Sequence, residues 1–274
     1  MNGIYNKFPN EFYFSRFRDN SITVLTRIRN ESVILLDFLE HISKFADNII
    51  VFDDDSNDNT LNICRLHDKV VAIVRNVYWT SENRSSLETL HRKLLLDCAV
   101  KNFASTWYFY MDADERIIGD NIREKVLSLD ANDITHIRIP LFDAYLTKDD
   151  FIAVKENESL INRRVYFGLE RRDIIFAWNK NAKAEYILDD AREPTIHNGK
   201  CILLFSCQHY GKAISLDKWD EKCKYYLNNF PYDSYGKKWE SRLGKGIHTT
   251  SDFGTPLYYW GSALFSNAII IHPL

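Results

Sequence analysis

A regular alternation of apolar runs and amphipathic segments in residues 21–118 is the feature that most restricts how this chain can fold. The β-branched runs SITVLTRI and VVAIVRN are typical of buried strands. The segments VILLDFLEHISKFA and 85–102 carry apolar residues at i, i+3 and i+4, which is the spacing of amphipathic helices. Because strands alternate with helices, we predict an α/β fold with a Rossmann-like, mainly parallel sheet flanked by helices.

Two acidic clusters follow apolar strands in this region. VFDDDSNDNT begins at Val51, and WYFYMDADERI begins at Trp107. Ligands of open α/β sheets bind at the carboxyl ends of the strands, and we expect the two clusters at the ends of neighbouring parallel strands. Asp112 and Asp114 side by side would form a hard-oxygen site suited to Mg²⁺ or Mn²⁺, which can hold a diphosphate. Acids at strand ends also form turns and helix caps, so this interpretation depends on the two clusters together.

The alternation of predicted strands and helices becomes less regular after Glu115. We predict a helix over 121–129, a strand at HIRIPLF, a loop or mobile flap over 148–158, a hairpin over 163–187, and a strand at CILLFSCQHY. The segment LDKWDEKCKYYL predicts an amphipathic helix. We therefore divide the chain into one domain, residues 1–214, and a C-terminal helical and aromatic extension, residues 215–274, packed on the same domain.

The composition excludes several classes of protein. The formal net charge of −3 lacks the basic excess of a nucleic-acid-binding protein. We interpret Arg163-Arg164 and Arg171-Arg172 mainly as solvated charge, with phosphate or anionic-membrane contact as the alternative. Five cysteines without a CxxC pair indicate reduced, cytosolic thiols. Without a signal peptide or a run of ~20 apolar residues, we expect a cytoplasmic protein, with peripheral contact at the inner membrane face left open.

Taken in order, the motifs give the chain a family resemblance. TRIRNES followed by LLDFLEH resembles the opening strand and helix of a family 2 type glycosyltransferase with the GT-A fold. VFDDDSNDNT resembles the "VDDGSTDGT" stretch of that family, and YMDADE resembles its DxD motif. The resemblance covers residues 21–118 well and the remainder thinly. It implies a nucleotide-sugar donor, UDP-sugar above all, and a Mn²⁺ or Mg²⁺ cofactor.

The resemblance also implies which residues bind the nucleotide. Thr26 and Arg27 would line the nucleotide pocket at the end of the first strand. Either Asp53 or Asp54 would bind the uracil or the ribose. Asp55 stands where the family has glycine, so we expect a differently shaped turn there and assign Asp55 no ligand role.

Further residues would serve the diphosphate and the metal. Arg84 and Arg92 precede the DxD strand, where the family places an arginine that faces the diphosphate, although Arg92 fits a solvent-facing helix position equally well. Asp112 and Asp114 would hold the metal, and Asp112 would thereby also contact the donor. His197 and His209 both resemble positions where relatives have a histidine after the sheet and before a helix, which here carries Ser215, Trp219 and Lys222. A late histidine completes the metal shell in such relatives, and His209 is the candidate for that role.

The acceptor side of the site is less well defined. An inverting transferase needs a carboxylate that deprotonates the acceptor hydroxyl. Glu170, Asp173 and Glu185 are the candidates, with Asp173 preferred because an apolar run follows it. The resemblance implies transfer to a glycan or lipid-linked glycan in bacterial surface-polysaccharide synthesis, such as that of lipopolysaccharide. A sugar nucleotidyltransferase and a non-catalytic carbohydrate-binding protein of the same fold are the alternatives.

Overall fold

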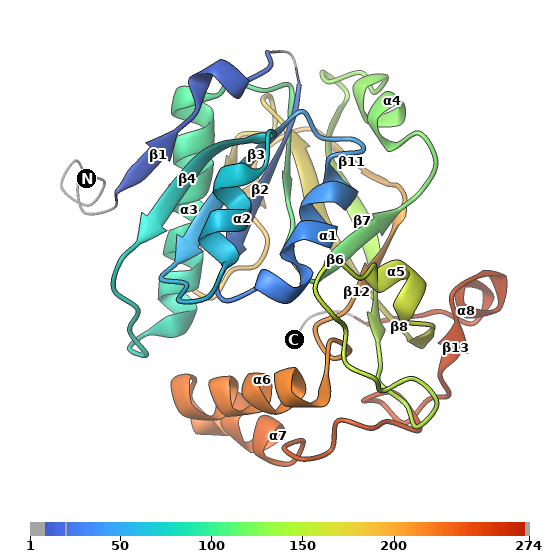
Figure 1. The fold of residues 1–274 in the computed structure, drawn as a ribbon. Coiled ribbons are helices and arrows are strands. Elements are labelled where there is room, and N and C mark those ends of the chain that lie inside the picture. Colours follow the sequence, from blue (N-terminus) through green and yellow to red (C-terminus); the bar gives the residue numbers. More distant parts are fainter. Residues whose placement is uncertain (1–8, 20, 272–274) are drawn as a thin grey trace.

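A 12-stranded mixed sheet runs through the computed structural model, which describes residues 9–19 and 21–271 (Figure 1). The strands of the main path follow the order β1-β4-β3-β2-β5-β8-β7-β12-β6. The strands are β1 (Asn10–Phe12), β2 (Ile22–Ile28), β3 (Asn48–Asp54), β4 (Val70–Asn76), β5 (Trp107–Tyr110), β6 (Glu115–Ile118), β7 (Ile134–Ala144), β8 (Tyr166–Asn179), β9 (Ala184–Glu185), β10 (Thr195–Ile196), β11 (Lys200–Leu203), β12 (Ser206–His209), β13 (Tyr258–Tyr259) and β14 (Ile269–Ile270).

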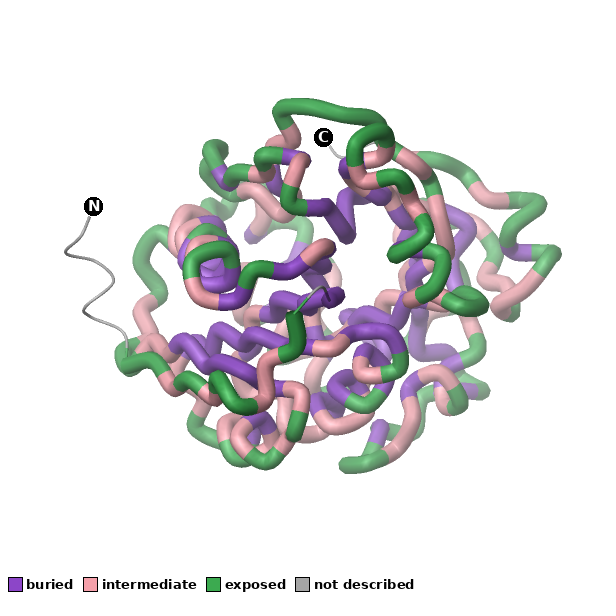
Figure 2. The backbone as a smooth tube through the Cα atoms, turned by 90° about the horizontal axis from the view of Figure 1, so that it is seen from above, coloured by how far each residue is buried: buried purple, intermediate pink, exposed green. Residues whose placement is uncertain are grey.

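Helices cover both faces of the parallel half of the sheet. They are α1 (Ser32–Ile42), α2 (Thr60–Leu66), α3 (Arg84–Asn102), α4 (Ile122–Leu127), α5 (Leu160–Arg163), α6 (Leu216–Asn229), α7 (Lys237–Glu240) and α8 (Ser262–Ser266), with short helices η2 (Phe14–Arg16) and η3 (Tyr232–Gly236). Alternate strand residues face opposite layers: Val24 and Val51 pack in the cluster of α1 and α2, whereas Leu25 and Phe52 pack in that of α3. Seen from above, buried segments occupy the interior and exposed ones mostly follow the rim (Figure 2).

This arrangement confirms the predicted fold class. β4, β3, β2 and β5 are parallel neighbours, and α1, α2 and α3 connect them, of which the periodicity predicted α1 and α3. The two acidic strands, however, are not adjacent as we expected. β2 lies between β3 and β5, so the residues that follow β2 separate the two acidic clusters.

Three details of the second half differ from the sequence predictions. The hairpin expected over 163–187 is wrong, since β8 continues as one strand of 14 residues that pairs antiparallel with β7 and β5. The strand expected at CILLFSCQHY is interrupted: β11 and β12 both pair with β7, and Phe205 between them has a φ of 64°. Arg164, which we predicted to be solvated, is fully buried. Its guanidinium donates to the Asp150 carboxylate at 2.7 Å and so contacts the irregular segment over 148–158.

The C-terminal extension has a small hydrophobic cluster of its own and also contributes two strands to the main sheet. Its helices enclose a small aromatic cluster around Trp219 and Trp239. Further along, β13 and β14 pair with β8, so part of the extension belongs to the main sheet. No helix in the described ranges is both long and apolar enough to cross a membrane.

Candidate active site

Asp114 and His209 meet at the carboxyl end of β5. The antiparallel pairing of β6 with β12 sets Glu115 opposite His209, which brings the imidazole to the acidic turn. As a result, His209 Nε2 lies 3.4 Å from Asp114 Oδ2. Asp112 lies two residues earlier in the same turn, where it accepts a hydrogen bond from the Tyr110 hydroxyl at 3.1 Å. Two of the three predicted metal ligands are therefore in direct contact.

A residue that the sequence analysis missed, Asp143, orients this histidine. The parallel pairing of β7 with β12 aligns Asp143 with His209, and the Asp143 Oδ1 to His209 Nδ1 distance is 2.5 Å. Burial disfavours the imidazolium, but the charges and hydrogen bonds of Asp114 and Asp143 outweigh it and raise the pKa of His209 to about 9. His209 is therefore held on both ring nitrogens by carboxylates.

These groups have the donor chemistry of a divalent metal site. A metal-binding histidine characteristically donates its second ring N–H to a carboxylate, as His209 does to Asp143. A methyl group at Gly211 would lie 2.6 Å from Asp114 Oδ2 and 2.8 Å from His209 Nε2, so only glycine leaves this face open. In the described part of the chain, no three His, Cys, Asp or Glu side chains are already grouped for a metal. Oxygens of a bound ligand or of water would have to complete the shell.

Two cations flank the acidic turn, and neither was predicted as an arginine or lysine of the site. Lys222 of α6 places its Nζ 3.7 Å from Asp114 Oδ2. Arg192 lies 3.4 Å from Asp112 Oδ2 through Nε and donates through Nη2 to Glu115 at 2.8 Å. Its Nη1 is buried and has no partner among the described residues. Positive charge thus surrounds the predicted diphosphate position from two separate elements.

Glu31 is a further carboxylate at this site. It stands at the start of α1, directly after β2, and interacts electrostatically with Asp114 and Lys222. Burial, and next the charge of Asp114, raise the pKa of Glu31 to about 8, although Lys218 and Lys222 act in the opposite direction. Within residues 9–19 and 21–271, no group hydrogen-bonds to its carboxylate. The motif TRIRNES contains Glu31, but nothing in its spacing indicated that it would face the acids.

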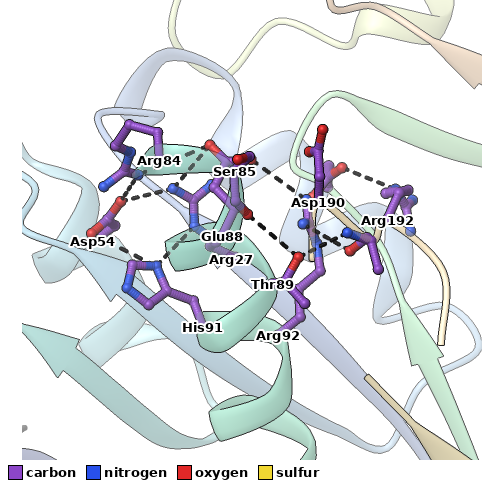
Figure 3. A network of polar contacts seen from close by, with 12 residues as sticks. Arg27, Asp54, Arg84, Ser85, Glu88, Thr89, His91, Arg92, Asp190 and Arg192 are labelled. Atoms are coloured by element: carbon purple, nitrogen blue, oxygen red, sulfur yellow. Dashed lines mark hydrogen bonds and ion pairs between the residues drawn. The ribbon is translucent and has the colours of Figure 1, made fainter. Parts of the chain in front are cut away.

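Both carboxylate oxygens of Asp54 accept hydrogen bonds from other residues of the chain. Its Oδ2 accepts from Arg27 at 2.7 Å and from Arg84 at 2.5 Å, and its Oδ1 accepts from Asn76 at 2.9 Å. Figure 3 shows Arg27, Arg84 and His91 directed at this carboxylate, which is fully buried. The arginines hold the pKa of Asp54 well below its usual range against the effect of burial. Arg27, Arg84 and Asp54 therefore form a structural ion cluster beneath the predicted nucleotide position.

The other predicted residues of the donor site differ in whether their polar atoms already have hydrogen-bond partners within the protein. Asp53 Oδ1 and Thr26 Oγ1 are buried without a partner in the described ranges, so both can still bond to a ligand. Arg92 is not solvent-facing: it is largely buried, donates to the Tyr110 hydroxyl at 3.1 Å and donates to the carbonyl of Ala191. Its guanidinium supports the tyrosine that holds Asp112.

The predicted acceptor-side residues lie along β8 and in the hairpin of β9 and β10. Glu170 is buried and accepts from the hydroxyls of Ser251 at 3.0 Å and Thr255 at 2.7 Å. Asp173 lies 3.2 Å from Arg171 Nη1. Glu185 is exposed and pairs at 3.5 Å with His197, outside the acidic turn.

Comparisons with known proteins give only distant structural similarity. No protein-family model and no curated protein matches the chain. Residues 1–349 of S. aureus TarS are 10% identical over 80% of this chain and 68% of that one, with a TM-score of 0.37. A second TarS structure is 12% identical over 81% of this chain and 42% of its own, also at 0.37. Glucosyl-3-phosphoglycerate synthase from Mycobacterium tuberculosis, in complex with Mn²⁺, UDP and glucosyl-3-phosphoglycerate, is 15% identical over 45% of this chain and 44% of its own, at 0.30. The chain spans less than half of the length of these last two proteins.

Proposed function

We propose that this chain is a metal-dependent glycosyltransferase of the GT-A type that moves a sugar from a nucleotide-diphosphate donor to a glycan or glycolipid acceptor. The observation that carries the proposal is the contact of Asp114 with His209, with Asp143 on the second ring nitrogen and Lys222 beside it. This set lies at the carboxyl edge of a parallel sheet, where α/β proteins bind nucleotides. The UDP base, the inverting course and a role in surface-polysaccharide synthesis follow from the sequence resemblance and belong to the same proposal.

Different residues of the chain would bind the metal, the diphosphate and the nucleoside. Asp114 and His209 would hold Mn²⁺ or Mg²⁺, with Asp112 close by. When bound, such an ion neutralises the charge that develops on a departing nucleoside diphosphate. Arg192, through its unpartnered Nη1, and Lys222 can bind diphosphate oxygens directly. Asp53 and Thr26 offer unpartnered oxygens deeper in the sheet for the nucleoside.

A carboxylate must also accept the proton of the acceptor hydroxyl. We propose Glu31 for this role, because no described residue hydrogen-bonds to its oxygens and it interacts electrostatically with Asp114 and Lys222. The charge of a bound metal ion would lower its raised pKa and so favour the ionised carboxylate that can accept the proton. Glu170 is the second choice, since two hydroxyls already occupy one of its oxygens. Asp173, the preferred base from the sequence, is paired with Arg171. Glu31→Gln, Glu170→Gln and Asp173→Asn should separate the three, since loss of the base lowers kcat more than it raises KM.

The central test is Asp114→Asn beside a matched control, Asp120→Asn, whose carboxylate is exposed and lies outside the site. We expect Asp114→Asn to abolish Mn²⁺ binding by calorimetry and transfer from UDP-sugars, with an unchanged circular dichroism spectrum, because it removes a metal ligand and no core side chain. Asp120→Asn should behave as wild type. Turnover that survives both Asp114→Asn and EDTA would refute the metal-dependent mechanism, and a complete lack of sugar transfer in wild type would favour a non-catalytic binding protein.

A further inference from the structure

A pocket of about 250 Å³ opens in the C-terminal extension, and no residue of the acidic turn lines it. Its lining includes Trp219, Arg242, Lys245, His248, Thr250 and Asp252. The sequence analysis assigned none of these residues to binding. Since a water molecule occupies ~30 Å³ in the liquid, the space equals roughly eight waters and admits a phosphate or diphosphate group.

A chain of ion pairs joins this pocket to His209. Asp252 at the pocket wall accepts from Lys212 Nζ at 2.6 Å, and Lys212 also donates to Asp143 Oδ2 at 2.7 Å. Asp143 in turn holds His209 at 2.5 Å. Paired side chains therefore connect the pocket wall to the proposed reaction centre.

Positive charge is in excess around the pocket. Asp252 is shared between Lys212 and Arg242, the latter at 2.9 Å. Lys245 Nζ donates only to the carbonyl of Ser241, at 2.9 Å, and no carboxylate in the described ranges forms a salt bridge with it. Lys238 of α7 does not line the pocket, but it interacts electrostatically with Arg242 and Lys212. Burial, and next the charges of Arg242 and Lys212, lower the pKa of Lys238, although the charge of Asp252 acts in the opposite direction.

Neutral hydrogen-bonding groups accompany these cations. Nothing in the described part of the chain bonds to the hydroxyls of Thr249 and Thr250, which line the pocket. His248 Nδ1 is buried and likewise without a partner there. Unpaired cations together with free hydroxyls match the oxygens of a phosphate ester, which accept several charge-assisted hydrogen bonds at once. A neutral glycan would leave Lys238 and Lys245 without an anionic partner.

We infer that this pocket binds the phosphate or diphosphate group of the acceptor, so that the chain acts on a phosphorylated acceptor. The inference adds a substrate class to the proposed function. It rests on that function only in identifying the bound phosphate as part of the acceptor. The binding of the anion itself depends only on the pocket. A soluble sugar phosphate and a lipid-linked diphosphate share this chemistry.

The test is a calorimetric titration of the full chain with inorganic pyrophosphate, without metal or donor. We expect Lys238→Gln and Lys245→Gln each to weaken pyrophosphate binding roughly three- to tenfold, since each removes one charged donor. The matched control is Lys101→Gln, an exposed lysine at the end of α3, which should bind as wild type. Arg192→Gln reports on the donor side of the site. If Arg192→Gln abolishes binding while Lys238→Gln and Lys245→Gln leave it unchanged, the anion binds elsewhere and the inference is wrong.

Two further titrations distinguish the sources of the phosphate. A hexose 1-phosphate represents soluble acceptors, and vesicles that carry a polyprenyl diphosphate represent lipid-linked ones. Binding of either that weakens in the Lys238→Gln, Lys245→Gln double variant supports the pocket and identifies the source, whereas failure of both overturns it. The proposed function is judged separately by UDP and Mn²⁺ binding: if these persist while all phosphates fail, only the acceptor inference is lost.

Discussion

The binding of Mn²⁺ should compete with a proton on His209. Without metal, the carboxylates of Asp114 and Asp143 raise the pKa of this imidazole to about 9, so it carries a proton at neutral pH. A metal needs the neutral Nε2 and must displace that proton. Below pH 9, the apparent affinity for Mn²⁺ should therefore rise almost tenfold per pH unit, roughly 80-fold from pH 6.5 to 8.5.

The assay is calorimetry at pH 6.5, 7.5 and 8.5, each in two buffers with different ionisation enthalpies. We expect close to one proton released per Mn²⁺ bound at the lower two pH values. Asp143→Asn is the informative variant, because the amide can still accept a hydrogen bond but its missing charge lowers the pKa of His209. Its Mn²⁺ affinity should depend less on pH than that of wild type. A Kd for Mn²⁺ that is constant over this range, with no proton release, would refute His209 as a ligand.

The raised pKa of His209 also makes the stability of the metal-free protein depend on pH. The pKa of His209 is raised above its usual 6.5, so the protonated form stabilises the metal-free fold. That contribution is fully present below pH 6.5 and is lost as the pH rises through about 9. Urea unfolding of the metal-free protein should thus show declining stability between these values, and saturating Mn²⁺ should offset the decline.

Three other substitutions test the structure further. Asp54→Asn leaves Arg27 and Arg84 only their longer contacts with Glu88, at 3.4 and 3.9 Å, and should cost about 3 kcal/mol of unfolding free energy. A loss below ~1 kcal/mol in urea titrations would contradict the ion cluster. Gly211→Ala places a methyl group between Asp114 and His209 and should weaken Mn²⁺ binding at least about tenfold with little change in Tm, whereas an unchanged Kd would exclude this face as the metal site. Glu31→Gln should raise Tm relative to wild type above pH 8 and leave it unchanged near pH 4, because the pKa of Glu31 rises from 4.5 to about 8 on folding and wild type loses stability across that range. Equal Tm differences at both pH values would argue against this.

The sequence alone determined the parallel half of the sheet and the position of the acids on it. β-Branched apolar runs and the 3.6-residue helical period are local properties, and they correctly predicted β2, β4, α1 and α3. The same local rule set Asp112 and Asp114 after a buried strand, at the edge where ligands bind. Strand order is not a local property, so the sequence could not indicate that β2 separates the two acidic strands.

Only the tertiary structure decided which side chains surround the acids. Asp143, Arg192 and Lys222 come from three separate segments and lie beside the turn in the folded chain, and the sequence assigned none of them to the site. Arg84 illustrates the converse. The family resemblance implied a diphosphate contact for Arg84, but the fold buries its guanidinium against Asp54. A buried charge is stable only beside an opposite charge, and which charges become neighbours depends on contacts between residues far apart in the chain.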